Sequence, residues 1–507
     1  MHVIVDGATI EITDEGATLL DVLREDAGVS AVKDGCSPQG QCGCCTVLVD
    51  GRPRVSCVTP VRRVRGREIT TVDGLPGEVA LAWAVAFTAT GASQCGFCTP
   101  GIICRFEGLR AKGTRPDDRD AAAAALQAHL CRCTGWQSIV DAWGAFGTEP
   151  VPASVGAARR AEIEGRVPQE VGVEIALGRG GFADDTAPSD ALVAVLSSEG
   201  DEWVVAESRA EAMRSAGKVQ GRRTTAAFDP PVELPAGDFD RTLRTTWVDP
   251  AYLETDASWC RPGGEPASPL ANGGAFGAKV DREVAAVARR LADEHQRPVR
   301  VRYSREDAVR RGPKRPPIAA GINADGTGVV RVVRTPGIAT VIAAVAPGLV
   351  VEEVDVAGPP TSASLRGAGW VEAVVLLSAV RDEVGWIAAP GGGSATATVA
   401  DDGSITVRVR AGSVLDETVL RSYCIGAAHM ALSWVTSESL GVDADGEIHD
   451  LTIRSFGVLR AIDTPPISVA IESDDGEPVN GSDAVFAAVA AAVWRSRGFP
   501  PEWPTGP

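Results

Sequence analysis

The sequence predicts a multidomain α+β protein in which two small N-terminal domains precede a larger mixed region. Its 507 residues exceed one ordinary core, since a domain usually takes about 100 to 200 residues. Ten of the twelve cysteines fall before residue 135, which separates the N-terminal third from the rest. The stretch 147–166 mixes Pro, Gly, Ala and charged residues without a clear period, which is typical of an interdomain linker.

These observations divide the chain into five segments, taken in order along the sequence. The expected segments are a β-grasp domain over 1–75, a helical domain over 76–147, a linker over 148–170, a small α/β domain over 171–235 and a larger α+β region over 236–507.

The overall charge and hydropathy exclude two classes of partner. With 49 Lys and Arg against 67 Asp and Glu, the net charge is -18, so we expect no nucleic-acid binding. The longest largely apolar run, 338–351, includes Pro347 and Gly348 and falls short of the ~20 residues of a membrane span. The N-terminus alternates like a strand and does not resemble a secretory signal. We therefore expect a cytoplasmic protein, whose cysteines favour metal binding over disulfides.

The first cysteine group predicts a plant-type [2Fe-2S] site. Such a site needs three thiolates on one tight loop and a fourth nearby, with glycines that let backbone N–H groups approach. The loop reads CSPQGQCGCC from residue 36, and a further cysteine follows the next hairpin. The predicted ligands are Cys36, Cys42, Cys45 and Cys57.

Two departures leave alternatives open at this loop. The first gap is five residues where four is usual, and Cys44 is a surplus thiol, so either Cys44 or Cys45 could be the third ligand. Cys45 is favoured because it restores the two-residue gap after Cys42 and leads directly into a predicted strand. A zinc site is the competing hypothesis, although zinc favours paired C-x2-C knuckles or histidines.

A second cysteine group lies at the ends of predicted helices over 78–88, 101–112 and 117–130. The segment QCGFCTPG opens one helix at 94–101, and LCRCTGW closes another at 130–136. A C-x2-C motif combined with a distant C-x-C motif is a demanding pattern, and helix N-termini would stabilise an anionic cluster. The predicted ligands of a second cluster are Cys95, Cys98, Cys131 and Cys133.

QCGFCTPG with LCRCTGW, downstream of a plant-type loop, resembles the xanthine dehydrogenase and aldehyde oxidase family of molybdenum hydroxylases. The match covers residues 1 to about 147. It implies a ferredoxin-like first domain and a four-helix-bundle second domain whose [2Fe-2S] cluster lies nearer a molybdenum cofactor. It also implies that Gln94 contacts the pterin, and that the region 236–507 is molybdopterin-binding-like.

The resemblance continues in fragments through the C-terminal region. The segment AYLE ending at Glu254 looks like an early motif of the pterin domain. The glycine-rich segment 273–279 looks like the pterin-side loop near the metal, and Val280 stands where purine-oxidising members carry a glutamate, which weakens a purine assignment. The implied cofactor contacts in this loop are Gly274, Ala275, Phe276 and Gly277.

Two further residues receive catalytic roles from the resemblance. Arg366 looks like the arginine at the substrate pocket, where a guanidinium could stabilise developing negative charge. Glu477 lies in a Gly-Glu-Pro turn before a predicted helix, which in the family carries the catalytic base. The implied reaction is hydroxylation of an aldehyde or N-heterocycle with water as oxygen source, after which electrons leave through both clusters.

The C-terminal region departs from the family in length. Only about 360 residues follow the helical domain, no Gly-Gln-Gly motif occurs, and Arg421 passes directly to Ser422 where relatives have a long insertion. One hypothesis is a compact molybdenum hydroxylase. The other is an iron-sulfur electron-transfer or assembly subunit with a non-catalytic C-terminal region. The expected partners are a small-molecule substrate and a second copy of the chain in a homodimer. Because no flavin-binding segment is recognisable, we also expect a flavin-containing subunit or an external electron acceptor.

Overall fold

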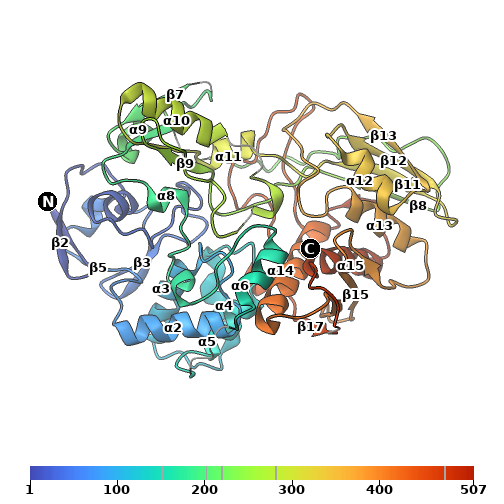
Figure 1. Cartoon of the computed structure of the whole chain (residues 1–507), viewed down its shortest axis with the longest axis horizontal. Coiled ribbons are helices and arrows are strands. Elements are labelled where there is room, and N and C mark those ends of the chain that lie inside the picture. The colour runs from blue at the N-terminus through green and yellow to red at the C-terminus, as the bar shows by residue number, and fades with distance from the viewer. Residues whose placement is uncertain are drawn as a thin grey trace.

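The chain folds into two lobes that lie side by side (Figure 1). The computed structural model describes residues 1–149, 154–200, 202–218, 221–273, 275–279, 283–472 and 475–506. One lobe holds the two cysteine-containing domains and a small sheet, and the other holds the C-terminal sheets and helices. No helix in the described ranges combines the length and the apolarity needed to cross a bilayer.

The first domain is the predicted β-grasp unit, a five-stranded sheet in the order β2-β1-β5-β3-β4. Val3 and Val5 alternate inward on the first strand, as a half-buried strand requires. A short helix follows Thr18, whose hydroxyl and backbone N–H exchange hydrogen bonds with Asp21 in a capping box. The elements are β1 (His2–Val5), β2 (Ala8–Glu11), α1 (Leu19–Asp21), η1 (Val22–Asp26), β3 (Thr46–Val49), β4 (Arg52–Val55), η2 (Val61–Val64) and β5 (Glu68–Thr70).

The second domain consists of four helices around an aromatic core. Trp83 packs on Phe106 with ring centroids 5.7 Å apart, and its indole N–H donates to Glu107. The fourth helix follows the C-x-C motif. Local sequence patterns do not predict it, whereas the four-helix bundle implied by the family resemblance does. The helices are α2 (Gly77–Ala89), α3 (Thr99–Arg110), α4 (Arg119–Ala125), extended by η3 (Leu126–Ala128), and α5 (Gln137–Gly144).

The residues predicted as a linker carry an ordered helix, α6 (Ala157–Gly165). Four of its side chains at helical spacing are buried, namely Ala157, Arg160, Ala161 and Glu164. The buried Arg160 guanidinium pairs with Glu164 and donates to the carbonyl oxygen of Val414 at 3.0 Å and of Val479 at 2.8 Å. The sequence did not predict this helix, because its buried face includes charged residues and therefore shows no apolar periodicity.

The small sheet crosses the boundary predicted at residue 235. Its order is β7-β6-β10-β9, so two strands come from 192–206 and two from 257–302. β10 pairs in parallel with β6, and this long-range pairing has no local signal in the sequence. The elements are α7 (Val173–Ala176), α8 (Ala183–Thr186), β6 (Leu192–Leu196), β7 (Trp203–Ala206), α9 (Arg209–Ser215), β9 (Ala257–Cys260), η4 (Ala275–Gly277), α10 (Glu283–His295) and β10 (Val299–Arg302).

The C-terminal lobe contains two sheets and the two longest of its described helices, α14 and α15, which pack on each other (Figure 1). Trp434 on α14 stacks on Phe486 of α15 at 5.4 Å. The elements are β8 (Arg241–Thr245), α11 (Arg305–Arg311), β11 (Ile318–Ile322), β12 (Gly328–Val333), α12 (Ile338–Val345), β13 (Leu349–Val354), α13 (Trp370–Ala379), β14 (Ile387–Ala388), β15 (Ser394–Val399), β16 (Ile405–Arg410), α14 (Glu417–Thr436), η5 (Ala461–Asp463), β17 (Ile467–Ile471), α15 (Ser482–Ser496) and β18 (Glu502–Trp503).

The buried ion pair on α6 predicts a large difference between neighbouring arginines. Arg160→Met should lower the free energy of unfolding by about 3 to 5 kcal/mol, because Glu164 would stay buried without its partner. Arg159→Ala is the matched control: Arg159 is 63% exposed beside Glu162, and its loss should cost less than about 0.5 kcal/mol. Denaturant unfolding followed by circular dichroism measures both, and equal midpoints would contradict the buried pair.

Candidate functional site

The first four predicted ligands come together at one end of the β3–β4 hairpin, where Cys45 precedes β3 and Cys57 follows β4. The Sγ atoms of Cys36 and Cys57 lie 4.0 Å apart, and the backbone N–H of Cys57 approaches Cys45 Sγ at 3.4 Å. Backbone N–H groups of the loop also point at Cys36, including that of Gln39 at 3.2 Å. Contacts with the Cys42 and Cys57 thiols and these N–H groups lower the pKa of Cys36. Buried thiols surrounded by amide donors suit an anionic iron-sulfur cluster.

The surplus thiol occupies a different place from its neighbour. Cys45 contacts Cys57, whereas Cys44 lies beside Cys42 with its Sγ 3.8 Å from the Cys42 carbonyl oxygen. Burial raises the pKa of Cys44, which disfavours a thiolate there. This geometry supports Cys45 as the third ligand of the first cluster, and the assignment stays a prediction.

The second group forms two thiol pairs. The Sγ atoms of Cys95 and Cys133 lie 3.8 Å apart, and Cys98 contacts Cys131. The contact with Cys98 and hydrogen bonding by Thr134 lower the pKa of Cys131. Within the described ranges, no three His, Cys, Asp or Glu side chains converge closely enough for a single metal ion. Two separated pairs are instead the arrangement that two irons require.

The two cysteine loops are locked together by backbone contacts. The N–H of Leu130, next to Cys131, donates to the carbonyl oxygen of Cys42 at 2.9 Å. Gly43 adopts a φ of +72°, and a Cβ there would lie 2.4 Å from the ring of His129. Burial lowers the pKa of His129 to about 3, so this ring is neutral. A hydrogen bond therefore connects a predicted ligand of one cluster to the residue beside a predicted ligand of the other.

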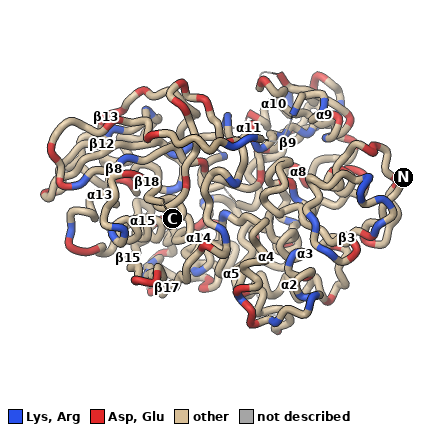
Figure 2. The backbone as a smooth tube through the Cα atoms, turned by 180° about the vertical axis from the view of Figure 1, so that it is seen from behind, with Lys and Arg blue, Asp and Glu red and all other residues tan. Residues whose placement is uncertain are grey.

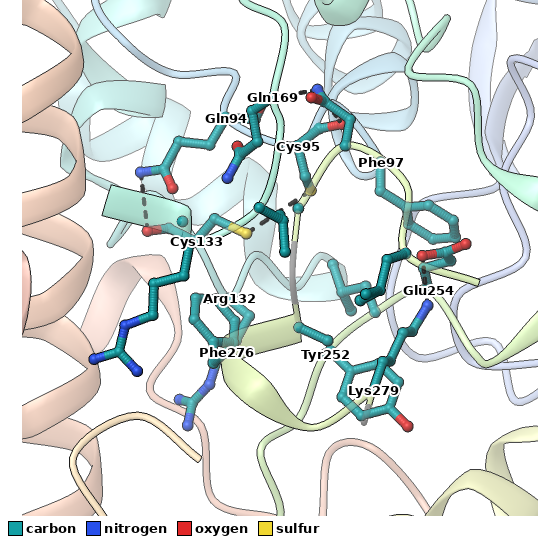
Figure 3. Close-up of a pocket in the computed structure, with 18 of the residues that line it drawn as sticks. Gln94, Cys95, Phe97, Arg132, Cys133, Gln169, Tyr252, Glu254, Phe276 and Lys279 are labelled. Carbon is teal, nitrogen blue, oxygen red and sulfur yellow. Dashed lines mark hydrogen bonds and ion pairs between the residues drawn. The ribbon is translucent and has the colours of Figure 1, made fainter. Parts of the chain in front are cut away.

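A cavity of about 210 Å³ lies next to the second cysteine group (Figure 3). Cys95 and Cys133 are the only half-buried members of the predicted ligand set, and both line it. Gln94 also lines the cavity, where its amide donates to the Cys133 carbonyl oxygen at 3.1 Å and to Ser422 at 2.9 Å. The cavity is therefore in direct contact with the second cluster site.

The glycine-rich loop forms one wall of this cavity. Ala275, Phe276 and Gly277 all have positive φ values, at 48°, 56° and 85°. A left-handed conformation at two non-glycine residues costs about 1 to 3 kcal/mol each and is found preferentially at functional sites. A Cβ at Gly277 would lie 1.9 Å from the Ser364 carbonyl oxygen, so glycine is needed here. The predicted contact Gly274, like Val280, lies outside the described residues.

Arg366 also reaches the cavity, but its charge is already paired. Its Nε donates to Asp483 at 3.0 Å and its Nη2 to Ser482 at 2.6 Å. Its backbone N–H donates to the Phe276 carbonyl oxygen at 2.9 Å, which joins it to the glycine-rich loop. Among the described residues, its Nη1 has no hydrogen-bond partner and is available to a ligand.

Glu254 is a cavity residue to which the sequence assigned no chemical role. One carboxylate oxygen accepts from Lys279 Nζ at 2.5 Å, and the other is buried without a partner among the described residues (Figure 3). Burial raises the pKa of Glu254 to about 7, against the opposing charge of Lys279. The two residues are 25 positions apart, so no local spacing could have revealed the pair.

Glu477, the predicted base, lies elsewhere. It is exposed on the turn before α15 and does not line the cavity. Its turn is held by the carbonyl oxygen of Gly476, which accepts from Ser413, and by the N–H of Val479, which donates to Ala411. The structure thus brings Gln94, Ala275, Phe276, Gly277 and Arg366 together around the cavity and leaves Glu477 outside it.

Comparisons with known proteins agree on the N-terminal domains. The 2Fe-2S iron-sulfur cluster binding domain matches residues 3–66, and the [2Fe-2S] binding domain matches residues 71–144. The small FeS subunit of nicotinate dehydrogenase from Eubacterium barkeri is 39% identical over 130 residues, which are 25% of this chain and 81% of that subunit. The aldehyde oxidoreductase of Megalodesulfovibrio gigas is 43% identical over 136 residues, 25% of this chain but only 14% of that enzyme.

The fold of the whole chain is similar to solved aldehyde oxidoreductases. The enzyme from Desulfovibrio desulfuricans aligns with a TM-score of 0.69 over 97% of each chain, at 14% identity. That from Desulfovibrio gigas aligns with a TM-score of 0.66 at 15% identity. At such identities the likeness concerns the fold alone, and it confirms the expected multidomain α+β architecture.

Fold and cysteine geometry together define an iron-sulfur protein with two [2Fe-2S]-binding domains. The chain belongs to the xanthine dehydrogenase and aldehyde oxidase family of molybdenum hydroxylases, which confirms the resemblance drawn from QCGFCTPG and LCRCTGW. Molybdopterin is the cofactor that fits this family of oxidoreductases.

The cavity residues fit a hydrogen-bonding cofactor of this kind. The lining carries three guanidinium groups, each paired with a carboxylate, and two amide side chains, which suit the donors and acceptors of a pterin. The glycine-rich turn lets backbone approach closely, as a bulky ring system requires. These residues are Arg132, Arg166, Arg366, Gln94 and Gln169.

The cysteine geometry makes a prediction that separates Cys44 from Cys45. Cys45→Ser should reduce iron from about four to about two atoms per chain, because the first cluster loses a ligand. Cys44→Ala is the matched control and should keep about four irons, since this thiol contacts Cys42 rather than Cys57. Iron analysis with electron paramagnetic resonance of the reduced protein measures both, and the reverse result would assign the ligand to Cys44.

Proposed function

We propose that the chain is a molybdenum hydroxylase that oxidises an aldehyde or an N-heterocycle with water as oxygen source. The cavity's direct contact with Cys95 and Cys133 carries the proposal, because a reaction there could deliver electrons at once to the second cluster site. Relatives named aldehyde oxidoreductase and nicotinate dehydrogenase support these two substrate classes.

In this proposal some residues of the chain bind the cofactor and the substrate, and another accepts a proton. Molybdopterin, when bound, supplies the two-electron oxidation of the substrate. Gln94 and the turn 275–277 hold it, and Nη1 of Arg366 meets a substrate oxygen. Glu254 accepts a proton, since it is the cavity carboxylate with an unpaired oxygen and a pKa near neutrality.

The lining also limits what can react. Phe97, Tyr252, Leu270 and Phe276 contribute aromatic and aliphatic surface, which favours a compact apolar or heteroaromatic substrate. A flavin-containing subunit or an external carrier then receives the electrons, as several relatives are named as small iron-sulfur subunits. All twelve cysteines are free thiols, which suits a reducing setting such as the cytoplasm.

One observation favours a second candidate function, an iron-sulfur electron-transfer or assembly subunit without catalysis. Glu477, the family's expected base, is exposed on a turn and does not reach the cavity. In that case the cysteine sites would be retained while the cavity carried out no oxidation.

Metal analysis tests the choice between these functions. Protein from a host that makes the molybdenum cofactor should contain about four irons and one molybdenum per chain, together with pterin. Gln94→Ala with Gly277→Ala should lose molybdenum and pterin while it keeps the iron, because both changes fall on residues that hold the cofactor in this proposal. Four irons without molybdenum or pterin in the parent protein would favour the electron-transfer subunit.

A pair of carboxylate variants tests the proton acceptor. In the parent enzyme kcat/KM should rise with pH through about 7, because Glu254 must lose its proton before it can accept one. Glu254→Gln should abolish this rise and reduce turnover by about 100-fold or more. Glu477→Gln is the matched control and should retain most turnover, and loss in this variant alone would return the role to Glu477.

A further inference from the structure

We propose that an exposed arginine patch on the β-grasp domain, which flanks the exposed Val58 in the sequence, is the docking surface for an acidic one-electron carrier protein. The inference deepens the proposed function, because it assigns the place and the charge of the electron acceptor. We define the arginine patch as Arg52, Arg54, Arg62, Arg63 and Arg65.

The first observation is the local charge. Residues 50–68 contain six arginines and only two acidic residues, in a chain whose net charge is -18. All six arginines are exposed, and Arg67 pairs with Asp50 at 3.5 Å. The five patch arginines form no ion pair with any described residue. Figure 2 shows basic segments around β3 in this lobe. The patch is therefore an uncompensated positive surface.

These arginines lie at exposed positions of β4, of η2 and of the residue that follows η2. On β4, Arg52 and Arg54 face outward, whereas Pro53 between them packs against Gly108 of α3. On η2, Arg62 and Arg63 are exposed, while the valines that flank them are buried. β4 and η2 are joined by the short segment that carries Cys57. Arg54 precedes Cys57 by three residues, about 10 Å along an extended strand.

The second observation is an apolar contact at the first cluster site. Val58 follows the ligand Cys57 directly and is 42% exposed. Its side chain lies against Gly40 of the cysteine loop, where a Cβ would come within 2.9 Å. Val58 therefore offers an exposed apolar side chain near the arginines in sequence, and protein interfaces combine apolar and polar residues.

Other sides of the same loop are covered by distant parts of the chain. Gln39 donates to the Leu451 carbonyl oxygen at 2.7 Å, and Arg454 donates to that of Gln41 at 2.8 Å. Arg305 donates to the Gly35 carbonyl oxygen at 2.5 Å. Because these contacts close the loop toward the C-terminal lobe, an electron acceptor approaches most directly over Val58.

Charge and placement together favour a carrier protein over other polyanions. A lipid surface or a nucleic acid would use the arginines but gain nothing from a position beside a redox centre. An acidic carrier uses both, since opposite charge raises the rate of encounter and orients a short-lived complex. One electron passes at each docking, so a two-electron oxidation in the cavity reduces two carriers.

Binding assays with the full-length, cluster-loaded chain test the proposal without substrate or molybdenum. The probes are a plant-type ferredoxin as acidic carrier, a cytochrome c as basic carrier and vesicles that contain phosphatidylserine. We expect ferredoxin to bind and its Kd to rise with ionic strength, while cytochrome c does not bind. The triple variant Arg54→Glu, Arg62→Glu and Arg63→Glu should weaken ferredoxin binding by about tenfold or more at low salt.

Two further variants make the result specific. Changing the same three arginines to lysine should preserve binding, because the charge is kept. Arg261→Glu, Arg381→Glu and Arg497→Glu alter net charge equally at exposed positions on other parts of the chain and should bind like the parent. Visible absorption confirms that each variant keeps both clusters, and stopped-flow oxidation of the dithionite-reduced chain by ferredoxin should slow in parallel with binding.

Several outcomes would overturn the proposal. Equal ferredoxin affinity of the parent and of the Arg54→Glu, Arg62→Glu, Arg63→Glu variant would exclude the arginine patch as the docking surface. An equal loss of ferredoxin affinity in the Arg261→Glu, Arg381→Glu, Arg497→Glu control would indicate an effect of net charge alone. Binding of the vesicles but not of ferredoxin would assign the patch to a lipid surface. None of these results depends on molybdenum content, so this proposal and the proposed function fail separately.

Discussion

The hydrogen bond from Leu130 N–H to the Cys42 carbonyl oxygen is the contact on which the arrangement of the two cysteine sites depends. Two anionic clusters repel each other, so their loops need neutral, directional contacts to remain close. Backbone contacts at Gly43 and Gly101 and the neutral ring of His129 supply them. The first domain and the helical domain accordingly share one continuous core.

The C-terminal lobe is built onto this pair of domains through further close backbone approaches. A Cβ at Gly426 on α14 would lie 1.7 Å from the Cys133 carbonyl oxygen, so the helix backbone contacts the second cysteine group at Cys133. Ser422, one turn earlier, receives the amide of Gln94. Arg132, between the two cysteines, forms a bidentate pair with Glu438 at 2.5 and 2.7 Å. The cavity therefore lies at a rigid junction between the lobes.

Local patterns predicted the elements that local physics controls. The alternation of Val3 and Val5, the two cysteine motifs and the glycine-rich turn each depend on neighbours in sequence, and their elements are present. A small α/β domain was predicted, but its extent past residue 235 escaped prediction because β6 pairs with β10, about a hundred residues further on. Helix α6 escaped because its inward face carries Arg160 and Glu164, which resemble surface residues until their partners are known.

The candidate site shows the same division. The motifs drew attention to Phe276 and Arg366, which both line the cavity, yet they could not show that Asp483 already neutralises Arg366. Nor could it show that Glu477 lies outside the cavity while Glu254 lies inside it. A motif records which residue types recur, whereas the protonation state of a carboxylate depends on what surrounds it in space.

The charges around the two ends of the proposed electron path differ in a way that suits the tasks proposed for them. At the cavity, arginines are paired with buried carboxylates such as Asp483 and Glu438, so the site stays close to neutral and can discriminate ligands by shape and hydrogen bonding. At the β-grasp surface the arginines are unpaired and exposed, where their field extends about 10 Å into solvent at moderate salt. In the enclosed cavity, paired charges leave shape and hydrogen bonding to select the ligand. On the open β-grasp surface, unpaired charges attract a partner from a distance. The chain separates the two, since the second cysteine group faces the cavity and the first lies beside the exposed Val58.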